Sequence, residues 1–232
     1  MDDIGYFITQ CLHEVAAQRE LRARDPELAR RVVAVKQFQH QRFALSYADL
    51  LADRRYAGAA AFFLEDLYGP RDFAERDSQF LRVVPALLRL FPKDLLATVS
   101  DLAALHALSE RLDTAMAKAI VQLPLDGLAY AQAWRAVGEP ASRERQIALM
   151  ASIGAALERY TRRAWLRQSL RVMRGPAQAA GLGALQLFLE RGFDTFRGMG
   201  GAQGFLDTIA QRERQLAAQL FDGADLGQVP PP

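Results

Sequence analysis

Apolar residues recur at helical spacing through almost the whole chain, and this periodicity limits the fold more than any other feature. Residues 94–121 illustrate it, because their large apolar residues fall on one broad face of a helix: Val99, Leu102, Leu105, Leu108, Leu112 and Met116. No segment alternates apolar and polar residues between hairpin turns, as a half-buried strand would. The sequence therefore predicts an all-α fold, an antiparallel bundle of about eight to ten helices.

Glycine and proline residues divide the helical pattern into segments. Gly69-Pro70 and Gly175-Pro176 each predict a helix end, because proline cannot continue a helix and glycine favours its end. The main interruption, at 122–142, is the expected subdomain hinge. We otherwise expect one domain over residues 1–221, followed by a flexible tail over 222–232.

Composition excludes several classes of protein. A single cysteine, Cys11, allows neither an internal disulfide nor a multi-cysteine metal centre. The acidic start Met-Asp-Asp is unlike a signal peptide, and the longest uncharged run, 15 residues at 175–189, is shorter than the ~20 residues of a membrane span. We therefore expect a cytoplasmic protein with no membrane span. A net charge of +2 gives no reason to expect a nucleic-acid partner.

The densest run of aromatic, acidic and turn residues lies at 56–73, where one helix ends and another begins. Glu65 and Asp66 interrupt an otherwise apolar helix, and we expect them to pair with Arg71, Arg76 or a more distant arginine. An ion pair that joins two helices is the favoured interpretation, and a metal or proton-transfer site is the alternative. The candidate binding residues of this corner are Glu65, Asp66, Tyr68, Arg71, Asp72, Arg76 and Asp77.

The heptapeptide Phe62-Phe63-Leu64-Glu65-Asp66-Leu67-Tyr68 resembles the motif of a group of bacterial proteins of unknown function, the FFLEELY-motif proteins. Asp66 stands in place of the second glutamate of that motif. The likeness extends over much of the chain and is most specific between Tyr56 and Asp77. The resemblance implies a family but no activity, cofactor or catalytic residue.

Residues 142–174 form the most basic segment, predicted as one long helix. It contains eight arginines and two glutamates, so the rest of the chain has a net charge of −4. The candidate binding residues are the arginines that recur every four positions: Arg159, Arg163, Arg167 and Arg171. Pairing with acids of the rest of the chain, among them Glu65, Asp66, Asp72 and Asp77, is the favoured interpretation. Binding of phosphate, nucleic acid or an acidic lipid surface is the alternative.

Two histidines lie near aromatic or polar residues at helical spacing. His40 shares a stripe with Phe43 and Tyr47, and these residues and His106 are the candidate lining of a pocket between helices. A haem is the less favoured alternative there, since such a histidine more often lies hydrogen-bonded at the edge of a core. Ser109 and Asp113 share a mid-helix ridge with His106, which does not fit a catalytic triad built on a strained turn.

Three functional hypotheses remain open. The favoured one is a non-enzymatic module that binds another protein or a second copy of itself, because no catalytic or metal-binding motif is found. The second is a small-molecule or cofactor binder with a pocket between helices. The third is an enzyme that acts on an anionic substrate through Glu65 or Asp66. We expect no metal site, and no cofactor apart from the haem alternative.

Overall fold

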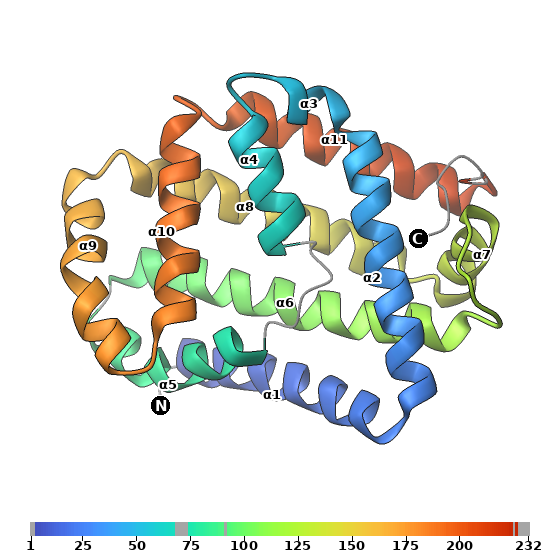
Figure 1. Ribbon diagram of the computed structural model, residues 1–232, viewed down its shortest axis with the longest axis horizontal. Helices are drawn as coiled ribbons and strands as arrows, with labels where there is room; N and C mark the ends of the chain where they lie inside the picture. The colour runs from blue at the N-terminus through green and yellow to red at the C-terminus, as the bar shows by residue number, and fades with distance from the viewer. Residues whose placement is uncertain (1–2, 68–73, 91, 225, 227–232) are drawn as a thin grey trace.

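The computed structural model describes residues 3–67, 74–90, 92–224 and 226, without the side chains of residues 67, 74–77, 81, 87, 90 and 164 (Figure 1). These residues form helices and no strand, so the predicted all-α fold is confirmed. The elements are α1 (Asp3–Arg24), α2 (Pro26–Ser46), α3 (Ala48–Ala52), α4 (Ala57–Phe62), the π-helical turn η1 (Phe63–Leu67), α5 (Ala74–Leu90), α6 (Lys93–Ala119), α7 (Gly127–Val137), α8 (Pro140–Thr161), α9 (Ala164–Ala179), α10 (Gly183–Gly198) and α11 (Gln203–Phe221).

The long helix α6 lies at the centre of the bundle. It packs against α1, α2, α7 and α8, and α8 in turn contacts α10 and α11. Figure 1 shows α8 returning past α6 in the opposite direction, while α2, α4 and α10 cross over this pair. At one edge lies α9, which contacts only α10 and the end of α8 to a substantial extent among the described elements. The central helix is therefore enclosed, whereas α9 is exposed along much of its length.

Local signals explain where several helices begin. The Asp25 carboxylate accepts hydrogen bonds from the backbone N–H groups of Glu27 and Leu28 and caps α2, whose first residue is Pro26. Asp126 caps α7 in the same way through the N–H of Ala129. These caps satisfy N–H groups that have no partner within the helix.

The predicted helix over 142–174 is wrong, because the chain turns at Arg162 and Arg163 between α8 and α9. The Tyr160 hydroxyl donates to the carbonyl oxygen of Asp94 at 2.9 Å, which fixes the end of α8 against the start of α6. The turn lets the apolar side of α9 pack on α10. Tertiary packing ends this helix at a place where the sequence has neither glycine nor proline.

The predicted helix end at Gly175-Pro176 is also wrong, since α9 continues through Pro176 to Ala179. Proline removes the N–H group that would bond the carbonyl of Val172. Both Val172 and Pro176 lie on the exposed side of α9, so solvent can satisfy that carbonyl. In α5 likewise, Pro85 lies within a continuous helix.

A glycine turn joins α10 to α11. Gly200 and Gly201 both have positive φ angles, of 62° and 136°, which a residue with a side chain adopts only at a cost. Arg55 holds the turn from outside, because its guanidinium donates to the carbonyl oxygens of Met199 at 2.8 Å and Gly201 at 3.0 Å. Among the described residues, the contacts of this turn therefore give it a structural role.

Candidate functional site

The acidic pair of the predicted corner lies on η1, where the helix widens to a π-helical turn. A single arginine of α10, Arg191, binds both carboxylates, Glu65 at 3.0 Å and Asp66 at 3.1 Å. The Asp66 side chain is largely buried, while that of Glu65 is about half exposed. This ion pair joins two elements that are 125 residues apart in the sequence.

The other residues of the corner are not placed. Tyr68, Arg71 and Asp72 lie outside the described residues, as do the side chains of Arg76 and Asp77. The described partner of the acidic pair, Arg191, was not among the arginines named from the sequence.

The arginine row divides between α8 and α9, and its described partners are acids of the rest of the chain other than Glu65 and Asp66. Arg163 lies 3.7 Å from Asp94, and Arg167 lies 3.2 Å from Asp194. Neither acid belongs to the corner. Arg159 and Arg171 are exposed and form no ion pair with the described residues. The row is therefore partly neutralised within the protein, by residues of α6 and α10.

The pocket candidates on α2 are part of the core. Phe43 and Tyr47 are fully buried, with ring centroids 4.4 Å apart. The Tyr47 hydroxyl donates to Glu213 at 2.7 Å, and the same carboxylate accepts two bonds from Arg42, at 2.5 and 3.1 Å. The Glu213 side chain is therefore largely buried, whereas those of its neighbours Arg212 and Arg214 are more exposed.

The two candidate histidines are half-buried and lie on different helices, His40 on α2 and His106 on α6. The charge of His106 helps to lower the pKa of Glu110, one turn further along α6. Ser109 accepts a hydrogen bond from Gln146 of α8 at 2.9 Å. In the described part of the chain, no group of three or more histidine, cysteine or acidic side chains is placed to hold a metal ion.

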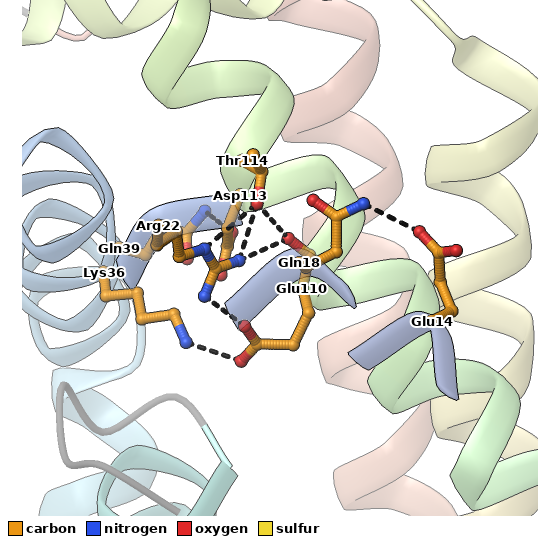
Figure 2. A network of polar contacts seen from close by, with 8 residues as sticks. All are labelled: Glu14, Gln18, Arg22, Lys36, Gln39, Glu110, Asp113 and Thr114. Atoms are coloured by element: carbon orange, nitrogen blue, oxygen red, sulfur yellow. Dashed lines mark hydrogen bonds and ion pairs between the residues drawn. The ribbon is translucent and has the colours of Figure 1, made fainter. Parts of the chain in front are cut away.

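A polar network joins α1, α2 and α6 around Glu110 (Figure 2). The carboxylate of Glu110, only 6% exposed, binds Arg22 of α1 and Lys36 of α2, the latter at 2.6 Å. Arg22 also donates to the Glu110 carbonyl oxygen at 2.7 Å and to the hydroxyl oxygen of Thr114. Burial raises the pKa of Glu110, but the charges of Lys36 and Arg22 outweigh it and bring the pKa down to about 2.

This network holds three helices together and is poorly suited to proton transfer. A general acid or base works best with a pKa near neutrality, whereas Glu110 remains ionised well below it. Both of its carboxylate oxygens already have cationic partners. One pattern in the sequence indicates this burial: Glu110 lies at helical spacing from Ala103, Ala107, Thr114 and Ala117, on a second face of α6.

The largest exposed apolar side chains of α9 lie on one flank of that helix. Trp165, Val172 and Met173 occur at i, i+7 and i+8, and they are 54%, 63% and 51% exposed. Leu166 and Leu170 lie about 100° and 140° round the helix from Trp165, and both are less exposed than Trp165. A notch beside Trp165 separates α9 from the start of α6 and is lined by Pro92, Asp94, Leu95, Tyr160, Arg163, Trp165 and Leu166. Sequence reasoning concentrated on the arginines and missed this flank.

The fold shows that this is an all-α, multi-helix protein. Most of the described buried polar side chains are paired with one another. A family profile described as "Domain of unknown function (DUF8198)" matches residues 18–226, and the chain belongs to this family. No curated protein and no solved structure matches the chain. Within the described residues, no helix has the length and apolar character needed to cross a membrane.

Proposed function

We propose that the protein is a non-enzymatic binding module whose contact surface is the apolar flank of α9. The observation that supports this function is the exposure of Trp165, Val172 and Met173 together on one side of one helix. Exposed apolar groups that gather in a patch mark interaction sites more often than those scattered singly. Tryptophan is also enriched among the residues that dominate the energy of protein interfaces.

The charge around the flank indicates the chemistry of the partner. From Arg162 to Ala179 the chain contains five arginines and no acidic residue. Four of these arginines form ion pairs with Glu158, Asp94, Asp194 and Glu190, while Arg171 has no ion-pair partner among the described residues. At the end of α8, Arg159 adds a further exposed charge without an ion-pair partner in the described residues. An amphipathic segment with apolar residues and carboxylates would match this surface best. We therefore propose another protein, with an acidic amphipathic helix, as the partner.

Two other occupants fit less well. In a symmetric dimer the same surface meets itself, so a contact between two α9 helices would bring arginine near arginine. On a membrane-surface helix the basic face is free to meet lipid headgroups. Here Arg167 and Arg174 are instead held by acids of α10, Asp194 and Glu190.

The test uses two synthetic helical peptides with the same apolar face, one with glutamates and one with lysines on its flanks. The glutamate peptide should bind the protein, and Trp165→Ala should weaken binding by about tenfold or more, as expected for a tryptophan at the centre of an interface. The matched control is Val121→Ala, which removes an 88% exposed valine far from α9 in the sequence.

Four results would contradict the proposal. One is a lysine peptide that binds as well as the glutamate peptide, and another is binding that Trp165→Ala leaves unchanged. A dimer in sedimentation that Trp165→Ala dissociates would make a second copy the occupant. Preferential binding of anionic over neutral vesicles would assign the flank to lipid.

A further inference from the structure

A second buried polar cluster, separate from α9, contains an arginine with free hydrogen-bond donors. Arg143, near the start of α8, is 4% exposed. Its Nη1 donates to Gln146 at 3.3 Å, but Nε and Nη2 have no hydrogen-bond partner among the described residues. It forms no ion pair with the described residues. A guanidinium buried in this state is costly unless something satisfies it.

The unpaired edge of the Arg143 guanidinium can bind two oxygen atoms at once. Nε and Nη2 form one edge of the planar guanidinium, and this edge binds both oxygens of a carboxylate in parallel. The guanidinium carbon lies 3.8 Å from the ring centroid of Trp134, on α7. The indole Nε1 of Trp134 is likewise buried without a hydrogen-bond partner. Three unused donors thus belong to two side chains in contact.

The acids around Arg143 have other direct partners among the described residues. Arg42, also buried, is paired with Glu213. Asp113 and Glu139, whose negative charges act on Arg143, form no ion pair with it: Asp113 accepts a hydrogen bond from Gln39 at 3.1 Å, and Glu139 pairs with Arg111. Burial raises the pKa of Asp113, which favours its neutral form, and burial lowers the pKa of Arg143.

We propose that Arg143 and Trp134 form an internal binding site for a small monocarboxylate, which the Nε–Nη2 edge and the indole N–H hold together. One unpaired positive charge matches one negative charge, so a monoanion fits better than a phosphate dianion. The orphan donors are closed from solvent in this structure. The ligand therefore enters when α7, bounded by the non-helical segments 120–126 and 138–139, moves outward.

The probe for this site is sodium acetate, added to Trp165→Phe protein, in which Trp134 is the only remaining tryptophan. Acetate should change the Trp134 fluorescence saturably, whereas sodium chloride at the same ionic strength should not. Sodium phosphate is the third titrant, because it separates a carboxylate site from a general oxyanion site. Stronger binding of phosphate than of acetate would overturn the assignment to a monocarboxylate.

Two variants test the role of the guanidinium edge. Arg143→Lys keeps the charge but loses the edge, so acetate affinity should fall by about tenfold or more, as expected when a charge-assisted hydrogen bond is lost. Arg143→Met should abolish the response. An unchanged response in Arg143→Lys would overturn the proposal. So would the absence of any saturable change in the Trp165→Phe protein itself, which needs no further variant to fold.

Discussion

Glu110→Gln should destabilise the protein by about 3 kcal/mol, because it leaves two buried cations without their carboxylate. Removal of one member of a buried ion pair costs about 3–5 kcal/mol. The lower end applies here, since Arg22 keeps its bonds to the Glu110 carbonyl oxygen and to Thr114. Lys36, with a side chain 20% exposed, can also turn towards solvent. The loss is a large fraction of a typical folding free energy of about 5–15 kcal/mol.

The pKa of Glu110 leads independently to the same magnitude. Folding lowers this pKa from its ordinary value of 4.5 to about 2, so the unfolded state binds the proton more tightly. The contribution to stability is therefore complete above pH 4.5 and disappears as the pH falls towards 2. At about 1.4 kcal/mol for each pKa unit, the shift corresponds to roughly 3 kcal/mol.

Urea denaturation of the wild type and of Glu110→Gln, at pH 7 and at intervals from pH 5 to pH 2, measures both effects. The difference in unfolding free energy should be about 3 kcal/mol at pH 7 and should shrink as the pH falls towards 2. The control is the triple variant Arg22→Met, Lys36→Met and Glu110→Leu, which removes all three charges. It should recover most of the lost stability. A Glu110→Gln protein within about 0.5 kcal/mol of wild type at pH 7 would refute the reasoning.

Three further predictions concern local packing and capping. In Gly154→Ala the new Cβ would clash with a methyl group of the buried Leu206, so stability should fall by about 1–3 kcal/mol in urea denaturation. In Gly58→Ala the new Cβ meets no other described atom within 4 Å on the exposed side of α4, so the melting temperature should rise, by a gain of about 0.5–1 kcal/mol. Asp25→Ala removes the cap of α2 and should cost about 1 kcal/mol, while Asp25→Asn should retain most of the cap, as compared by thermal unfolding.

The parts of the fold that depend on residues close together in the sequence were predictable. The start of α2 at Asp25-Pro26 and the glycine turn before α11 follow from capping and from backbone conformation. The helical class follows from the spacing of apolar residues. The break between α8 and α9 was not predictable in this way, because contacts with α6 and α10 decide it.

The pairing of charges was the least predictable feature. Arg22 and Glu110 are 88 residues apart, and Arg42 and Glu213 are 171 apart, so no local pattern relates them. The burial of Glu213 had a signal, since it lies four residues after Ile209 and three before Leu216, on the apolar face of α11. Because charged residues are usually exposed, the spacing alone does not predict that Glu213 is buried.

The exposed apolar surface on α9 was also not predictable from the sequence. The sequence shows that this helix is amphipathic, but an apolar face normally packs inside a protein. Only the tertiary structure shows that α10 covers one part of that face and leaves Trp165 and Val172 exposed. The arginines are the more conspicuous feature of the sequence, although several of them form ion pairs within the protein.

The proposed function is tested most directly by photo-crosslinking from two exposed valines, Val172 on α9 and Val121 between α6 and α7. Each is replaced in turn by a photoreactive amino acid in the full chain, in its native host cells. The account predicts that position 172, but not position 121, captures a distinct protein through an acidic amphipathic segment, and that Trp165→Ala abolishes this capture. Identical products from both positions, or capture at position 172 that survives Trp165→Ala, would contradict it.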